Sequence, residues 1–143
     1  MTNWADLLKT LAANKVLGNP RLRRAFEIID RAKFVRPDDI LFAYEDHPLS
    51  IGWGATISQP YTLAFMLDRL APEVGDRVLD IGAGSGWSTA LLAATIGPRG
   101  RVWGVEVVPE LAAFGQQNLK KYPKLPAEIL PTGKSLGLPA KAP

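Results

Sequence analysis

The stretch VLDIGAGSG, Val78–Gly86, has the pattern of a strand that ends in a glycine turn. The short apolar run RVLDIG, with its β-branched residues, predicts the strand, and Trp87–Ile96 predicts a helix directly after the turn. Three glycines, Gly82, Gly84 and Gly86, therefore separate a strand from a helix. Glycine at such a corner lets the backbone turn tightly and lets a ligand approach the main chain.

Strand and helix patterns alternate outward from this turn. The segment RGRVWGVEV, residues 99–107, predicts a second strand, residues 109–121 a helix, and AEIL, residues 127–130, a third strand. This alternation is typical of a parallel sheet in an α/β fold. The proline-rich tail, residues 122–143, predicts loop apart from that third strand.

The first half of the chain is predicted to be mainly helical. Residues 3–16 and 21–31 show apolar stripes at helical spacing, and the sequence GNP separates them. A further helix is expected from Pro60 to Leu70, with Ser58 as a candidate N-cap. Between these helices lies the loop Asp46–Pro60, which is rich in glycine, proline and hydroxyl residues.

The composition excludes several kinds of site. The chain has no cysteine, so disulfides, thiolate nucleophiles and cysteine-ligated metals are excluded, and with one histidine we predict no metal site. The net charge of +3 comes largely from basic residues between Arg21 and Arg36, including Arg31. We interpret these charges as a solvated helix surface and not as a nucleic-acid interface. The N-terminus lacks the apolar core of a signal peptide, and no apolar run is long enough to span a bilayer, so we expect a cytoplasmic protein without membrane contact.

The spacing of the glycines and the neighbouring acid distinguish two candidate ligands. A dinucleotide fingerprint has the spacing G-x-G-x-x-G, whereas this turn has G-x-G-x-G, and Asp80 stands two residues before the first glycine. A carboxylate there would repel a pyrophosphate but suits the cationic groups of S-adenosylmethionine. Glu106 ends the second strand, 20 residues after Gly86, where an acid can accept both ribose hydroxyls. We therefore predict S-adenosyl-L-methionine as the cofactor.

Three segments together resemble protein-L-isoaspartate O-methyltransferases: RAKFVRPDD (residues 31–39), AYEDHPLSIGWGATISQP (residues 43–60) and RVLDIGAGSGWSTALLA (residues 77–93). The resemblance runs from about residue 16 to the C-terminus. It implies N-terminal helices followed by a Rossmann-like methyltransferase sheet. On this basis residues 1–60 form a helical region with the substrate and cofactor loop, and residues 61–143 a partial methyltransferase domain, within one structural domain overall.

The resemblance also implies roles for the loop Asp46–Pro60. Ser58, in the sequence TIS, would be the active-site residue, and Ala55, Thr56 and Ile57 would line the cofactor. The implied activity is methyl transfer to the carboxylate of L-isoaspartyl residues in damaged proteins, a step of protein repair. The alternative interpretation of Ser58 is that it only caps the following helix. His47 falls at a variable position of the family's loop, and we interpret it as an exposed residue.

The sequence departs from the family's pattern in two places. Gly133, followed by Lys134, stands where the family has an aspartate that reads the adenine, so we expect weaker cofactor binding. The chain also stops at Pro143, where the family continues into a fourth strand. The strand RVLDI would then be an exposed edge, which predicts a homodimer, a complementing chain or an incomplete gene product. Two other functions stay open: cofactor binding without catalysis, and methyl transfer to a different acceptor such as a nucleic acid or a small molecule.

Overall fold

The computed structural model describes residues 2–133 and 137–139 of the chain. The helices and strands are, in order, α1 (Trp4–Ala13), α2 (Pro20–Ile28), the 3-10 helices η1 (Arg31–Lys33) and η2 (Pro37–Phe42), β1 (Leu49–Gly52), β2 (Ala55–Ile57), α3 (Pro60–Leu70), β3 (Arg77–Ile81), α4 (Trp87–Ile96), β4 (Arg101–Glu106), α5 (Pro109–Leu119) and β5 (Ala127–Pro131).

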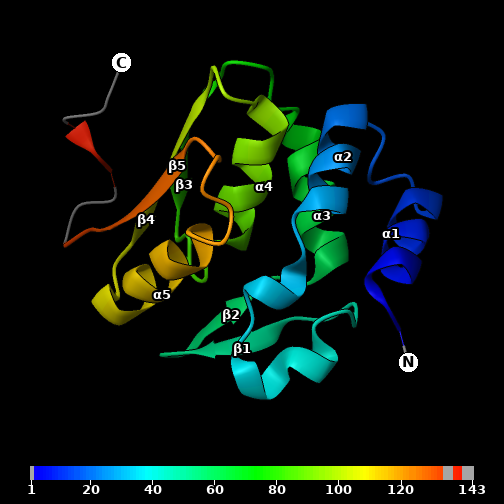
Figure 1. The fold of residues 1–143 in the computed structure, drawn as a ribbon, viewed down its shortest axis with the longest axis horizontal. Coiled ribbons are helices and arrows are strands. Elements are labelled where there is room, and N and C mark those ends of the chain that lie inside the picture. The colour runs from blue at the N-terminus through cyan, green and yellow to red at the C-terminus, as the bar shows by residue number, and fades with distance from the viewer. Residues whose placement is uncertain (1, 134–136, 140–143) are drawn as a thin grey trace.

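The main sheet is parallel, with strand order β3-β4-β5. In this register Val78 lies opposite Val102, and Gly104 lies opposite both Asp80 and Ile129. Helices α4 and α5 form the crossover connections that parallel neighbours require. Figure 1 shows α4 between the sheet and α2. The α/β fold with a parallel sheet and N-terminal helices is therefore confirmed.

Both crossover helices cover the same face of this sheet. A side chain on Gly104 of β4 would meet Thr89 of α4 and also Ile129 of β5, which reaches α5. Because successive side chains of a strand point to opposite faces, Leu79 and Ile81 point away from these helices. Their exposed fractions are 42% and 58%. Among the residues that the structure describes, β3 has a strand on one side only, so it is the expected edge strand.

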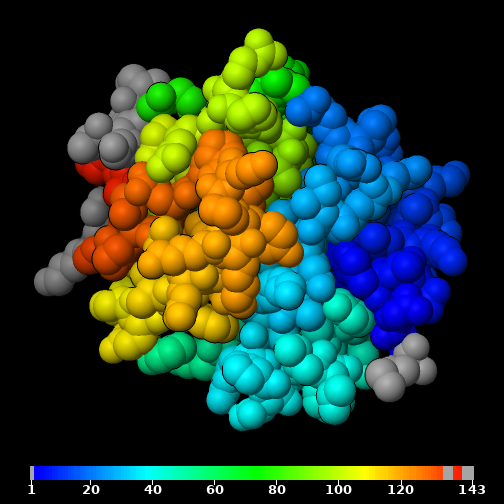
Figure 2. Space-filling view, in the orientation of Figure 1, coloured from blue at the N-terminus to red at the C-terminus, as the bar shows by residue number. Residues whose placement is uncertain are grey.

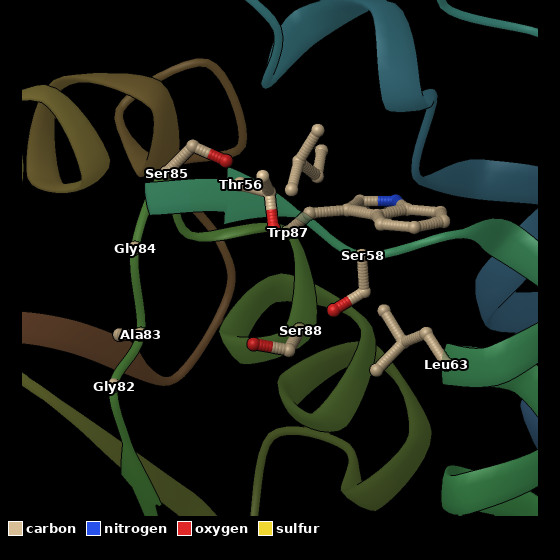
Figure 3. Close-up of a pocket in the computed structure, with 10 residues that line it drawn as sticks. Thr56, Ser58, Leu63, Gly82, Ala83, Gly84, Ser85, Trp87 and Ser88 are labelled. Atoms are coloured by element: carbon tan, nitrogen blue, oxygen red, sulfur yellow. The ribbon is translucent and has the colours of Figure 1, made fainter. Parts of the chain in front are cut away.

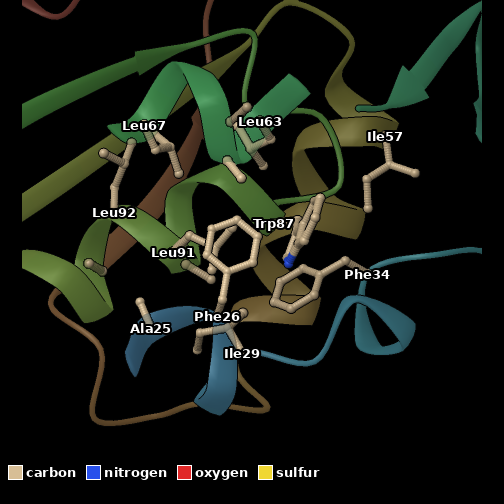
Figure 4. Close-up of a cluster of buried hydrophobic side chains, with 14 of the residues drawn as sticks. Ala25, Phe26, Ile29, Phe34, Ile57, Leu63, Leu67, Trp87, Leu91 and Leu92 are labelled. Carbon is tan, nitrogen blue, oxygen red and sulfur yellow. The ribbon is translucent and has the colours of Figure 1, made fainter. Parts of the chain in front are cut away.

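A hydrophobic cluster joins the N-terminal helices to α4 (Figure 4). The rings of Phe26 in α2 and Trp87 in α4 meet edge to face with centroids 5.8 Å apart, and Trp4 of α1 lies 6.4 Å from Trp87. Full burial of one large apolar side chain stabilises a fold by about 1.5–3 kcal/mol. This cluster fixes the start of α4 against the first half of the chain. The boundary that we drew at residue 60 stays a prediction.

The N-terminal helices end earlier than the sequence indicates. Helix α1 stops at Ala13, and Lys15 follows with a left-handed φ of 61°. Helix α2 stops at Ile28 because Ile29 is extended and Asp30 accepts a hydrogen bond from the Ala32 N–H, which starts η1. None of the helices in residues 2–133 and 137–139 has the length and apolar content needed to cross a membrane.

The turn after α5 is attached to the segment that follows α2. The Asp30 N–H donates to the Tyr122 hydroxyl at 3.0 Å, and Lys121 Nζ donates to the Lys33 carbonyl at 2.7 Å. Figure 2 shows these two parts of the chain side by side on one continuous surface. These two hydrogen bonds therefore join the segment after α5 to the N-terminal half of the chain.

Candidate functional site

The glycine turn lies at the carboxyl end of β3, against the end of β4. The N–H groups of Gly82 and Ala83 both donate to the Val105 carbonyl, at 2.9 and 3.0 Å. Gly82, Gly84 and Gly86 have φ values of +80°, +56° and +97°. This left-handed region is strained for residues with a Cβ, so the backbone itself explains the three glycines.

Neighbouring elements pack closely around part of this turn. A Cβ on Gly104 of β4 would lie 2.8 Å from the Ala83 Cβ, and one on Gly115 of α5 would lie 2.7 Å from the Gly84 carbonyl oxygen. A Cβ on Gly82, by contrast, would meet nothing within 4 Å. Strand β4 and helix α5 therefore pack against the turn at Ala83 and Gly84. At Gly82 the main chain is open, so a ligand can approach it there.

The two predicted acids are both held in place near the turn. Asp80 Oδ2 accepts hydrogen bonds from Ser88 Oγ at 2.7 Å and Thr89 Oγ1 at 2.8 Å, in the first turn of α4. Glu106 is buried, and its Oε2 accepts from the Gly84 N–H at 3.0 Å while its Oε1 accepts from the Val108 N–H at 3.3 Å. Each carboxylate oxygen of Glu106 keeps further lone pairs, so it can also accept ribose hydroxyls.

The loop Asp46–Pro60 contains a two-stranded antiparallel sheet that covers the turn. Strands β1 and β2 pair with Leu49 opposite Ile57, and the register shifts after Ser50. The Ile51 side chain of β1 packs against the turn, because its Cδ1 lies 3.2 Å from the position of a Cβ on Gly84. The sequence did not predict these strands, which are only four and three residues long.

A small cavity lies between β2, α3 and the glycine turn (Figure 3). Its volume is about 50 Å³, and its lining residues are Thr56, Ile57, Ser58, Leu63, Gly82, Ala83, Gly84, Ser85, Trp87 and Ser88. Figure 3 shows the Ser58 hydroxyl directed toward Ser88 across the cavity. The predicted residues Ala55, Asp80, Gly86 and Glu106 do not line it. Pockets that bind a small molecule usually measure about 300–1,000 Å³. This cavity therefore encloses only part of the volume that a cofactor such as S-adenosylmethionine would need.

Ser58 is not a helix cap, so the alternative interpretation of this residue is wrong. The N-cap of α3 is Gln59, which makes no side-chain capping bond, and Pro60 supplies the first helical residue. Instead, the start of α3 is tied to the loop, because the Tyr61 N–H donates to Asp46 Oδ1 at 2.9 Å. In the part of the chain that the structure describes, no hydrogen bond engages the Ser58 hydroxyl.

Arg31 is buried, so its predicted place on a solvated helix surface is wrong. Its side chain is 0% exposed, and its Nη atoms donate to the carbonyls of Ala43 (3.0 Å), Glu45 (3.1 Å), His47 (2.9 Å) and Ser58 (2.9 Å). Burial lowers the pKa of Arg31 to about 10, and the Asp46 carboxylate partly opposes this shift. The guanidinium therefore stays charged at neutral pH.

His47 is exposed, as expected, and lies at the outside of the same loop. Its ring contacts the Pro48 carbonyl through Nδ1 and the Glu45 carboxylate through Nε2. Both contacts raise the pKa of His47, the Pro48 carbonyl more than Glu45.

A family model for protein-L-isoaspartate(D-aspartate) O-methyltransferases matches residues 2–143. The chain belongs to this family. A protein-L-isoaspartate O-methyltransferase of Aeropyrum pernix is 42% identical over 139 residues, which cover 96% of this chain and 53% of that protein. One of Anaeromyxobacter dehalogenans is 48% identical over 124 residues, which cover 86% of this chain and 58% of that protein.

A solved structure from Plasmodium falciparum, assigned to the same methyltransferases and complexed with S-adenosyl-L-homocysteine, has a TM-score of 0.81 at 28% identity. The match covers 92% of this chain and 64% of that one. The chain thus spans about half the length of the curated relatives it matches.

The departure from the isoaspartate methyltransferase pattern after β5 falls beside Glu106. The Thr132 N–H donates to the Glu106 carbonyl at 2.9 Å, so Gly133 directly follows a residue bonded to the end of β4. Among the described residues, none would lie within 4 Å of a Cβ on Gly133. Lys134, which we named with it, lies outside the described residues.

From the sequence we did not predict three residues that support this candidate site: Arg31, Gly104 and Gly115. Arg31 lies in the basic stretch between Arg21 and Arg36, and we interpreted all charges of that stretch as solvent-exposed. A glycine inside a strand and another inside a helix are unfavourable for both elements, which is a signal of close backbone approach.

Proposed function

We propose that this chain transfers the methyl group of S-adenosyl-L-methionine to the carboxylate of L-isoaspartyl residues in damaged proteins. The observation that carries the proposal is the position of Ser58, whose hydroxyl enters a cavity formed jointly by β2 and the glycine turn. The names of the relatives and the ligand of the Plasmodium structure support it.

The residues around the turn fit the cofactor. The main chain is open at Gly82, Glu106 offers acceptor oxygens for hydroxyl groups, and the fixed carboxylate of Asp80 adds negative charge. We propose these residues, together with Gly84 and Gly86, as the groups that hold it. Ala55, Thr56 and Ile57 would cover it from β2. When bound, the cofactor supplies a methyl group activated by a positively charged sulfur.

The acceptor chemistry needs little from the chain beyond alignment. The acceptor is the free α-carboxylate of the isoaspartyl residue, which is already ionised at pH 7, so no general base has to remove a proton. The Ser58 hydroxyl can donate a hydrogen bond to the substrate carboxylate and orient it. Ideal positioning alone can lower a barrier by about 7–11 kcal/mol.

We further propose that the free edge of β3 pairs with a strand of another polypeptide, in the simplest case a second copy of this chain. Edge strands present unpaired backbone groups, and Leu79 and Ile81 add exposed apolar side chains on the same strand. The cytoplasmic location stays a prediction.

Cofactor binding without turnover is the second candidate. It is favoured by Gly133, which brings no side chain to the region beside Glu106 where the family has an acid.

Two measurements separate these candidates. Calorimetric titration with S-adenosylhomocysteine, with NAD as the control ligand, tests the cofactor. Chromatography then follows the conversion of an isoaspartyl peptide into the aspartyl peptide in the presence of S-adenosylmethionine. Binding with conversion supports repair methylation, binding without conversion supports the second candidate, and preference for NAD contradicts both.

A further inference from the structure

We propose that Arg31 is a positioning residue for methyl transfer, which holds Ser58 in place against the glycine turn. The proposal rests on the function proposed above. It is carried by the contacts of the Arg31 guanidinium, which reach three separate parts of the site.

The first part is the segment that leads into β1. One planar group binds the carbonyls of Ala43, Glu45 and His47, which alternate along the chain, so the segment curves around the guanidinium. Arginine suits this task because its donors form a rigid fork. Arg31 thus binds three backbone carbonyls of the segment that leads into β1.

The second part is Ser58 itself. The same Nη2 atom that binds the His47 carbonyl also donates to the Ser58 carbonyl, both at 2.9 Å. This atom thus joins the two ends of the segment that contains β1 and β2. The backbone of Ser58 is fixed by this bond, while its hydroxyl remains directed into the cavity.

The third part is the start of α4. The Arg31 Cζ lies 5.3 Å from the centroid of the Trp87 ring, and Trp87 both follows the glycine turn and lines the cavity. Cation and ring attract each other in this arrangement. Ser58 and the glycine turn are therefore located relative to each other through Arg31.

Burying the charge of Arg31 costs desolvation free energy that an apolar residue at this position would not cost. Arg31 is fully buried, and among the described residues its charge has no carboxylate in salt-bridge contact. An apolar residue of similar volume is often at least as stabilising at a buried ionic position. The benefit of Arg31 is therefore geometric: it satisfies four carbonyls that no apolar side chain can bind.

The experiment compares Arg31→Lys and Arg31→Gln with the unsubstituted chain and with Arg21→Lys. Arg21 is the matched control because its Nε also donates to a backbone carbonyl, that of Thr95 at 3.0 Å, but at the far end of α4. Amide hydrogen exchange of residues 46–58 and of α4, affinity for S-adenosylhomocysteine, and kcat and KM for an isoaspartyl peptide are measured for each protein. Lysine keeps the charge but lacks the fork, so it tests geometry directly.

We expect Arg31→Lys to raise exchange in residues 46–58 about tenfold while α4 stays protected. The value of kcat/KM should fall by about ten- to a hundredfold, because a displacement near 1 Å at a reacting group costs about this much. Cofactor affinity should fall by a smaller factor than kcat/KM, because Ala55, Thr56 and Ile57 lie in the loosened segment whereas Glu106 and the glycine turn make no hydrogen bond to Arg31. Arg21→Lys should change loop exchange and kcat/KM by less than about twofold.

Folded Arg31 variants with unchanged loop exchange and unchanged kcat/KM would overturn the proposal. So would a uniform rise in exchange across loop and α4, because it would show a purely structural role. If the unsubstituted chain does not methylate the peptide, the proposed function fails. Amide hydrogen exchange of residues 46–58 in the Arg31 variants then still decides whether Arg31 fixes Ser58.

If neither Arg31 variant folds, the unsubstituted chain provides the test. Arg31 Nη2 donates to the Ser58 carbonyl oxygen, so NMR should then detect scalar coupling between Arg31 Nη2 and the Ser58 carbonyl carbon across this hydrogen bond. Absence of this coupling in the folded chain would overturn the proposal.

Discussion

Ser58 has two separate roles at the residue scale. Its carbonyl oxygen accepts a hydrogen bond from Arg31, whereas its hydroxyl lines the cavity beside the glycine turn. A capping serine would use its hydroxyl on the helix backbone, and this one does not. Within the described residues the hydroxyl is therefore unbonded and faces the cavity.

Replacing Ser58 by alanine should reduce activity and leave stability nearly unchanged. Loss of a hydrogen bond to a charged group costs about 1.5–3 kcal/mol, so kcat/KM for an isoaspartyl peptide should fall by about ten- to a hundredfold. The midpoint of urea unfolding should stay the same, because no capping bond is lost. Ser50→Ala, on the neighbouring strand, is the control and should keep full activity. A loss of about 1 kcal/mol in stability at unchanged kcat/KM would instead indicate a structural hydroxyl.

The protonation of His47 predicts a pH-dependent stability. Contacts with the Pro48 carbonyl and the Glu45 carboxylate raise its pKa in the folded state above the ordinary value of 6.5. The folded state then binds the proton more tightly, so the stabilisation is complete below about pH 6.5 and is lost as the pH rises through the raised pKa. Unfolding titrations of the unsubstituted chain and of His47→Gln should differ at pH 5.5 and converge at pH values above the raised pKa of His47. A difference that grows with pH would contradict this assignment.

Site residues that follow from local patterns could be predicted from the sequence, and those that depend on tertiary contacts could not. The glycine turn, Asp80 and Glu106 stand at fixed places relative to a strand, so their positions near one another followed from topology. Arg31 lies 27 residues before Ser58, and nothing in its own neighbourhood shows that it is buried. Its hydrogen-bond partners are backbone carbonyls, which every residue type has, so the sequence does not indicate them.

At the scale of elements, the packing of α5 against the glycine turn decides how the site is built. Gly115 allows the helix to approach Gly84, and Asn118 Nδ2 donates to the Ser85 carbonyl at 2.9 Å. The helix therefore contacts the turn through two successive positions on one face.

Replacing Gly115 by alanine should destabilise the protein, against the trend for helices. Alanine is ordinarily better than glycine inside a helix by about 1 kcal/mol. Here its Cβ would lie 2.7 Å from the Gly84 carbonyl oxygen, and overpacking of this kind costs about 1–3 kcal/mol. Urea unfolding should show the loss, and affinity for S-adenosylhomocysteine should fall because the turn is displaced. Gln117→Ala, at an exposed position of the same helix, should be neutral or slightly stabilising. A stabilised Gly115→Ala protein would show that the contact is looser than described.

The order and type of the regular elements could largely be predicted, whereas the conformation of the loop could not. Strands β3 to β5 and helices α3 to α5 follow from apolar periodicity and from glycine and proline positions. Strands β1 and β2 are too short to show a period, and three consecutive left-handed residues, Gly52, Trp53 and Gly54, form the turn between them. Trp53 in that conformation could not be anticipated, because a bulky residue rarely adopts it.

At the scale of the whole molecule, the edge strand β3 is the proposed site of association with a second copy. Leu79 and Ile81 are exposed on a strand that has a neighbour on one side only within the described residues. If a second copy pairs with this edge, the chain should associate reversibly as its concentration rises.

Sedimentation velocity of the unsubstituted chain and of Leu79→Lys tests this association. A charge on the edge strand should shift the protein toward the monomer, because natural edge strands use lysine to block pairing. Val74→Lys is the control, since Val74 is equally exposed but lies in the loop before β3. A monomer at every concentration, or equal effects of both substitutions, would contradict the homodimer.

Methyl incorporation from labelled S-adenosylmethionine tests the central claim most directly. The purified 143-residue chain is given an isoaspartyl peptide, with the normal aspartyl peptide of the same sequence as control. The account predicts base-labile label in the isoaspartyl peptide and none above background in the aspartyl peptide. Equal labelling of both peptides, or no labelling by folded protein that binds S-adenosylhomocysteine, would contradict it.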